Sequence, residues 1–190
     1  MEKNSGYRVK LSLGKKFCYG IGDIGEGMSN GFVAMFFLIF CTDTFDINAG
    51  VIGTLLLLGR FWDMINDTWV GAWTDRTRSR WGRYRPWLIF ATIPLFIITI
   101  LLFWAHPEWT SGAKTAWIVI FYFLWAFAYT CVNIPYTALN AVMTQDIEER
   151  ASLASWRMVF TNIATILISA VGINLVMSFG HGDMAKGWLI

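Results

Sequence analysis

The chain of 190 residues is 56% hydrophobic and 17% aromatic but only 15% charged, and its mean hydropathy is positive. A soluble domain usually has about 25% charged residues, so this composition excludes an ordinary soluble protein and indicates an integral membrane protein. The net charge of +2 is too small to indicate a nucleic-acid partner.

Five apolar segments are long enough to cross a bilayer at about 1.5 Å per helical residue. They are residues 17–40, 51–73, 87–104, 115–143 and 155–178, and a sixth begins at residue 188. We therefore expect an all-α, polytopic membrane helix bundle with five complete helices and the start of a sixth. Because the chain stops where a helix begins, the sequence also suggests a fragment of a longer protein. No small-residue cleavage site follows the first apolar segment, so we expect no cleavable signal peptide.

The basic residues predict the orientation of this bundle. Eleven of the fifteen Lys and Arg residues precede the first apolar segment or lie in the second and fourth loops: Lys3, Arg8, Lys10, Lys15, Lys16, Arg76, Arg78, Arg80, Arg83, Arg85 and Arg150. The opposite loops contain only Lys114 and Lys186. By the positive-inside rule, the amino terminus and the second and fourth loops are expected to be cytoplasmic.

The segment 17–40 carries two acids one helical turn apart, Asp23 and Glu26, among several glycines that permit close helix approach. Asp23 has two open interpretations, a structural partner of a loop arginine or a member of a polar cavity. Glu26 lies deeper in the segment, and a functional role is favoured there. The cysteines Cys18, Cys41 and Cys131 are expected to be packing residues without disulfides.

Charged and amide side chains interrupt the segment 51–73: Arg60, Asp63, Asn66 and Asp67. Each ionised side chain at the centre of a membrane helix costs about 2.5 to 3.5 kcal/mol on insertion scales. Asp63, Asn66 and Asp67 share one helical face, where two carboxylates about 6 Å apart repel by about 3 kcal/mol. A proton, a small hard cation such as Na⁺, or a structural ion pair with Arg60 would relieve this repulsion. The pattern favours the proton or cation site.

The following loop, residues 71–87, is rich in arginine and contains Asp75. One interpretation is a positive-inside anchor. The other is a conformational latch, in which Asp75, Arg76 and Arg83 form charge-assisted hydrogen bonds at the cytoplasmic helix ends.

A polar stripe runs along the segment 115–143, formed by Thr130, Asn133, Thr137 and Asn140, with Tyr129 beside it. Hydroxyls and amides both donate and accept, so the stripe suits a hydroxyl-rich ligand, with interhelical hydrogen bonding as the alternative. Pro135 frees the backbone carbonyl of Cys131 and is expected to kink this helix. Arg157, in the segment 155–178, either faces inward to balance the acids or extends to the cytoplasmic surface.

Four motifs together carry a family resemblance: YGIGD from residue 19, LLGRFWDMINDTWVGAWTDRTRSRWGRYRPW from residue 57, YTCVNIPYTAL from residue 129 and SWR from residue 155. The chain resembles the glycoside-pentoside-hexuronide:cation symporters, the melibiose permease-like family of the major facilitator superfamily. The resemblance covers nearly the whole chain. It implies the amino-terminal half of a twelve-helix transporter whose carboxy-terminal half is missing.

The resemblance also implies site residues. The coupling-cation site would be formed by Asp63, Asn66, Asp67 and Thr130, which are the metal ligands if the cation is Na⁺. The substrate site would include Glu26, Tyr129, Asn133 and Arg157. Asn133 and Gly27 stand where melibiose permease has aspartates. The asparagine in VNIPY is similar to the xyloside and glucuronide branches, which implies a β-xyloside, a xylo-oligosaccharide or a hexuronide.

The expected function is therefore symport of a glycoside with Na⁺, or with H⁺ or Li⁺, by alternating access, with no other cofactor. The expected location is the inner (plasma) membrane, as a multi-pass protein. Two alternatives stay open, a Na⁺-coupled lysolipid transporter and a half-transporter with a structural or regulatory role. An enzyme is not expected, because the apolar segments contain no histidine and no metal-ligand cluster, and His106 and His181 lie in loops.

Overall fold

The computed structural model describes residues 10–104, 106 and 108–180, and the regular elements in this part of the chain are all helical. They are α1 (Leu13–Ile21), α2 (Ile24–Ile39), the π-helical turn η1 (Phe40–Thr44), α3 (Ala49–Arg76), α4 (Arg85–Leu102), α5 (Ser111–Met143) and α6 (Ile147–Phe179). The predicted all-α bundle is confirmed. The sixth helix predicted from residue 188, together with Lys3, Arg8, His181 and Lys186, lies outside the described residues.

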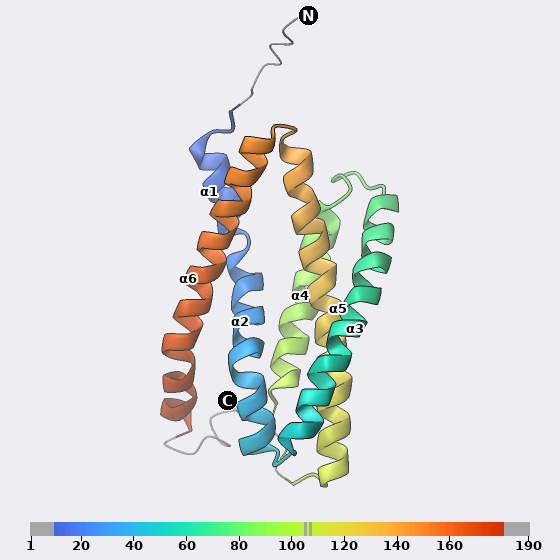
Figure 1. Ribbon diagram of the computed structural model, residues 1–190, viewed down its shortest axis with the longest axis vertical. Helices are drawn as coiled ribbons and strands as arrows, with labels where there is room; N and C mark the ends of the chain where they lie inside the picture. Colours follow the sequence, from blue (N-terminus) through green and yellow to red (C-terminus); the bar gives the residue numbers. More distant parts are fainter. Residues whose placement is uncertain (1–9, 105, 107, 181–190) are drawn as a thin grey trace, which may run out of the picture.

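The helices form two groups. In one group α1 and α2 pack against α6, and in the other α3 and α4 pack against α5 (Figure 1). Fewer contacts join the groups, mainly between α2 and α5 and between α5 and α6. The seam between the groups is therefore the place where a cavity can open within the bundle.

Four helical stretches are long and apolar enough to cross a membrane: Leu13–Thr44, Arg85–Leu102, Ser111–Met143 and Ile147–Phe179. Their outer faces carry exposed apolar side chains, such as Ile100 and Ile166. Helix α3 has 28 residues but falls outside this set, because Arg60, Asp63 and Asp67 make it too polar. That α3 spans the membrane stays a prediction.

The first predicted helix, residues 17–40, is not continuous. It breaks at Gly22 and Asp23, between α1 and α2. The carbonyl of Tyr19 accepts the hydroxyl of Tyr136 from α5, and the amide of Asp23 bonds the carbonyl of Gly20 instead, at 3.1 Å. Gly22 allows this approach, because a Cβ there would lie 2.8 Å from the Tyr136 hydroxyl oxygen. The break is thus imposed by a side chain from another helix.

The boundaries of the later helices also differ from the predictions, and α3 and α4 are each displaced by two or three residues. Helix α6 begins at Ile147 rather than at residue 155, because the Asp146 carboxylate accepts the Glu148 amide at 2.8 Å and caps the helix. Helix α5 begins at Ser111 rather than residue 115 and continues through Pro135 as one helix.

Two buried clusters each join helices across the seam. A large one packs α2, η1, α4 and α5 together around Phe37, Phe40 and Trp125. A smaller one joins α1, α5 and α6 through Tyr19, Tyr136 and Leu153. The rings of Tyr19 and Tyr136 stack at 4.9 Å. The two clusters hold the helices on both sides of the cavity described next.

Candidate functional site

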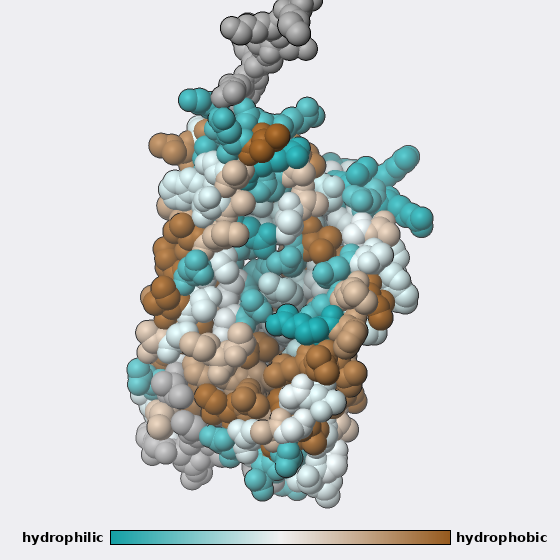
Figure 2. Space-filling view, in the orientation of Figure 1, coloured by the Kyte–Doolittle hydropathy of each residue, from teal (hydrophilic) through white to brown (hydrophobic). Residues whose placement is uncertain are grey.

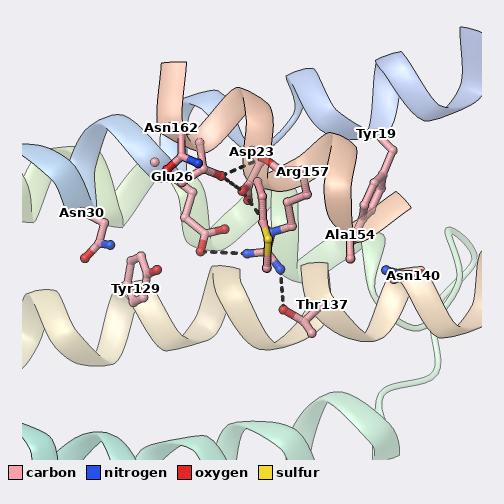
Figure 3. Close-up of a pocket in the computed structure, with 13 residues that line it drawn as sticks. Tyr19, Asp23, Glu26, Asn30, Tyr129, Thr137, Asn140, Ala154, Arg157 and Asn162 are labelled. Carbon is pink, nitrogen blue, oxygen red and sulfur yellow. Dashed lines mark hydrogen bonds and ion pairs between the residues drawn. The ribbon is translucent and has the colours of Figure 1, made fainter. Parts of the chain in front are cut away.

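A cavity of about 390 Å³ opens on the seam between α1 and α2, α5 and α6 (Figure 3). In Figure 2 hydrophilic residues gather in the middle of the bundle, with hydrophobic residues around them. The polar and charged residues that line the cavity are Tyr19, Asp23, Glu26, Asn30, Tyr129, Thr137, Asn140, Arg157, Thr161 and Asn162. Four helices on both sides of the seam thus contribute to one polar chamber.

Arg157 is the centre of this chamber and faces inward from α6 (Figure 3). Its Nε lies 2.9 Å from Asp23 Oδ2, and its Nη2 lies 3.5 Å from Glu26 Oε1. Its Nη1 donates to Thr137 Oγ1 of α5 at 2.6 Å. Its guanidinium also lies 5.0 Å from the ring centroid of Tyr136. One cation therefore connects α1–α2, α5 and α6.

Asp23 and Glu26 bring two negative charges to one guanidinium. Asp23 is 2% exposed and Glu26 is 6% exposed. Asp23 Oδ1 and Glu26 Oε2 are buried and have no hydrogen-bond partner among the described residues. Because buried polar atoms are normally paired, these two oxygens are acceptors for a proton or a buried water.

Of the predicted substrate residues, Glu26, Tyr129 and Arg157 line the cavity directly. Asn133 is not among the residues that line the cavity. It contacts two residues that do, because its Nδ2 donates to Glu26 Oε1 and, at 3.3 Å, to the Tyr129 hydroxyl. The polar stripe of α5 therefore contacts two different parts of the bundle. Thr137 reaches Arg157, while Thr130 is buried and turned toward α3.

The predicted cation residues are only partly brought together. Thr130 Oγ1 donates to Asp67 Oδ1 at 3.3 Å, which joins α5 to α3. Asn66 is 1% exposed, and its Nδ2 has no partner among the described residues. Asp63 lines a second cavity of about 160 Å³ together with Arg60. In the described part of the chain Arg60 forms no ion pair within 4.0 Å, so the structural pairing with the acids is absent there.

The two cavities share Asn30 and Tyr129 in their walls. The face of α3 that bears Asp63 is therefore connected, through two side chains, with the chamber around Arg157. No cluster of three or more His, Cys, Asp or Glu side chains suited to a metal occurs among the described residues. A cation near α3 would need amide, hydroxyl or carbonyl oxygens in addition to the carboxylates.

The predicted latch residues lie at the end of the bundle where α3 ends and α4 begins. Arg83 Nη1 lies 3.6 Å from Asp75 Oδ1, and the Tyr84 hydroxyl donates to the same oxygen at 3.4 Å. Both charged side chains are more than half exposed. Arg76 is exposed at the end of α3 and forms no ion pair in the described residues.

Sequence reasoning missed several polar positions. Asn30 follows Glu26 by four residues, a helical spacing that would have extended the polar face of α2. A partly buried ion pair also joins α1 to α6, where Lys16 Nζ lies 2.9 Å from Glu149 Oε2 and donates to Ser152 Oγ at 2.9 Å. No local pattern in the sequence marks that pair.

Comparison with known proteins places these features in a family. Residues 18–190 match the family described as MFS/sugar transport protein. The chain is 38% identical over 178 residues to the inner membrane symporter YicJ of Escherichia coli, which covers 94% of this chain and 38% of that protein. It is 35% identical over 180 residues to the putative glycoside/cation symporter YagG of Escherichia coli, covering 95% of this chain and 39% of that protein.

A vertebrate relative is also similar. The chain is 32% identical over 165 residues to the sodium-dependent lysophosphatidylcholine symporter 1 of Gallus gallus, which covers 86% of this chain and 31% of that protein. The chain thus spans less than two fifths of the length of each of these relatives.

Proposed function

The chain belongs to the MFS/sugar transport protein family, and from this premise we propose that it provides a sugar chamber and a cation site to a cation-coupled glycoside symporter. The observation that carries the proposal is the chamber of about 390 Å³ around Arg157. It presents charged, amide and hydroxyl groups, with two carboxylate oxygens that lack partners in the described residues. Sugar hydroxyls both donate and accept, so they suit such a lining.

Within the glycosides, we favour a neutral β-xyloside or xylo-oligosaccharide over a hexuronide. Asp23 and Glu26 together outnumber Arg157, so the chamber holds more negative than positive charge when all three are ionised. A second anion would then be repelled. A hexuronide would need a proton on one of the two acids.

For the coupling cation we propose a site between α3 and α5 that includes Asp63, Asn66, Asp67 and Thr130. The hydrogen bond from Thr130 to Asp67, which brings a hydroxyl oxygen and a carboxylate oxygen together, supports this position. Na⁺ is the leading candidate, with H⁺ or Li⁺ as alternatives. Because Asn30 and Tyr129 border both cavities, occupation of one site would alter the wall of the other, which is coupling by linkage.

We further propose that the chain crosses the plasma membrane several times with its amino terminus in the cytoplasm, and that Asp75, Arg76 and Arg83 form a cytoplasmic latch. The start of α1, the α3–α4 loop and the α5–α6 loop lie at the same end of the bundle (Figure 1). These are the segments with most of the basic residues. An exposed pair such as Asp75 and Arg83 contributes only about 0–1 kcal/mol, so it would bias a moving bundle without locking it.

A second candidate function is transport of a lysolipid. The similarity to the lysophosphatidylcholine symporter favours it. Against it stands the polar lining of the chamber, since an acyl chain gains nothing from carboxylates and amides.

The test is uptake by cells that express the complete protein containing this chain. A labelled panel of xylobiose, a glucuronide, melibiose and lysophosphatidylcholine is offered with and without Na⁺ at constant pH, and then with a proton gradient. Saturable, cation-stimulated uptake of xylobiose is the expected result. Uptake of lysophosphatidylcholine alone would support the second candidate function instead. Uptake of none of the compounds would reject both functions.

A further inference from the structure

A third cavity lies at the basic end of the bundle, apart from the chamber around Arg157. Its volume is about 510 Å³. Arg83 and Arg85 contribute the positive charge, and Leu139 and Val142 of α5 contribute an apolar wall. No acid lines it among the described residues. The cavity thus combines two guanidinium groups with an apolar surface.

An apolar crevice lies between α4 and α5. It has a volume of about 350 Å³ and is lined by Pro86, Trp87, Phe90 and Ala91 of α4 and by Cys131 of α5. These residues lie within helical stretches long and apolar enough to cross a membrane. The crevice therefore offers apolar side chains below a cationic cavity.

Two features make the cavity and the crevice neighbours. Arg85, in the wall of the cavity, directly precedes Pro86, in the wall of the crevice. The ring of Trp81, from the cavity, stacks on that of Phe90, from the crevice, with centroids 6.2 Å apart. One elongated molecule can therefore lie across both.

We propose that the cavity and the crevice together bind one molecule of an anionic phospholipid. Its phosphate lies at Arg83 and Arg85, and one acyl chain lies in the crevice between α4 and α5. Basic pockets at the ends of membrane helices suit anionic headgroups, and tryptophan and tyrosine side chains favour the same interfacial level. The site is separate from the proposed sugar chamber and does not depend on the transported substrate.

Asp75 would compete with a bound phosphate for Arg83. Its carboxylate lies 3.6 Å from Arg83 Nη1, so a phosphate would share or displace that pairing. The pair is more than half exposed and weak. Arg85 forms no ion pair among the described residues and is free to meet the headgroup.

The test measures lipid retained by the purified chain. The chain is reconstituted in nanodiscs of phosphatidylcholine with phosphatidylglycerol, extracted in neutral detergent, and examined by native mass spectrometry. The double variant Arg83→Gln with Arg85→Gln is compared with Arg78→Gln with Arg80→Gln, which removes the same charge from the same loop but outside the cavity wall. The cavity variant is expected to bind phosphatidylglycerol about 30-fold more weakly, from about fivefold for each arginine, and the control at most a few-fold more weakly.

A second pair of variants tests the crevice without changing charge. Ala91→Phe is expected to fill it and to release phosphatidylglycerol, whereas Ile93→Phe, at an exposed position outside its lining, leaves binding unchanged. Equal losses in both arginine pairs would show general surface attraction and overturn the proposal. Undiminished binding of phosphatidylglycerol by Ala91→Phe would also overturn the proposal, because the crevice would then not hold the acyl chain. Displacement of phosphatidylglycerol by inorganic phosphate alone would overturn it as well, because the cavity would then be a phosphate site and not a lipid site.

Discussion

At the scale of single residues, the balance of charge around Arg157 decides what the chamber can hold. The guanidinium contacts Asp23, Glu26 and Thr137, and its side chain is only 18% exposed. Removal of one member of a buried pair costs about 3 to 5 kcal/mol, because the remaining charge loses its partner. Arg157 is therefore expected to be needed for the fold as well as for the ligand.

The first prediction is that Arg157→Gln lowers the stability of the purified protein by several kcal/mol and abolishes sugar binding. The loss follows from the two carboxylates left without a cation, of which Asp23 is 2% exposed. Thermal unfolding in detergent and binding of the transported sugar are the measurements. Adding Asp23→Asn to this variant is expected to recover most of the stability but not the binding. An unchanged unfolding midpoint in the single variant would contradict the prediction.

The second prediction concerns the acids of α3. In the complete protein, Asp63→Asn and Asp67→Asn are each expected to reduce the apparent affinity for the coupling cation by at least about tenfold, or ~1.4 kcal/mol. Asp67 accepts a hydrogen bond from Thr130, and Asp63 borders the second cavity. Cation-dependent uptake of the sugar measures the effect. Asp43→Asn, at an exposed acid of η1 outside both cavities, is the control. Normal cation stimulation in both variants would reject the site.

At the scale of elements, the break between α1 and α2 sets the position of Asp23. Tyr136 of α5 donates to the Tyr19 carbonyl, and the Tyr19 hydroxyl donates to the Tyr136 carbonyl at 3.2 Å. These reciprocal bonds fix α1 against α5 at the point where the helix stops. Asp23, directly after the break, then meets Arg157 of α6.

The third prediction follows from Gly22. A Cβ at this position would lie 2.8 Å from the Tyr136 hydroxyl oxygen, whereas a Cβ at Gly25 would lie 3.6 Å from Phe96 Cζ. Gly22→Ala is therefore expected to lower stability by about 1 to 3 kcal/mol, as overpacking does, and Gly25→Ala to be tolerated. Thermal unfolding of the two variants makes the comparison.

A double variant distinguishes the clash from a general effect of alanine. Tyr136→Phe removes the oxygen that the new Cβ would meet, so Gly22→Ala combined with Tyr136→Phe is expected to cost less than the sum of the two single variants. Strict additivity would show that the break does not depend on this contact.

At the scale of the whole molecule, the distribution of polar and apolar surface indicates how the bundle lies in a membrane. Exposed apolar side chains cover the outer faces. Hydrophilic residues gather at the end of the bundle (Figure 2) where Figure 1 places the α3–α4 and α5–α6 loops. An apolar outside and a charged end agree with the multi-pass arrangement proposed above. The orientation itself is open to a direct test.

The fourth prediction is that Ser79→Cys, between α3 and α4, reacts with an impermeant maleimide only in permeabilised cells, whereas Ser111→Cys, at the start of α5, reacts in intact cells. Both serines are exposed. The excess of basic residues in the loop after α3 is the reason, by the positive-inside rule. The background is Cys18→Ser, because the other two native cysteines are buried. The reverse labelling pattern would invert the proposed topology.

The class of fold and the polar faces of the helices follow from the amino-acid sequence alone. Long apolar segments require helices in a bilayer, because each backbone polar group must be bonded within its own segment. Helical spacing placed Asp23 and Glu26 on one face of the chain, and Asp63 and Asp67 on another. Charges within an apolar segment also predicted a polar face on α3. The sequence left Arg157 between an inward and a surface position, and the structure places it in the chamber.

Only the tertiary structure decided which of these faces meet. Helical periodicity fixes the residues that share a face, but the rotation of a helix toward its neighbours depends on packing between distant side chains. Glu26 and Arg157 are 131 residues apart in the sequence, and only the fold puts them 3.5 Å from each other. The break at Gly22 likewise depends on Tyr136, 117 residues beyond the carbonyl of Tyr19 that it binds. Such contacts leave no periodic pattern in the chain, because each is a single long-range match between helices.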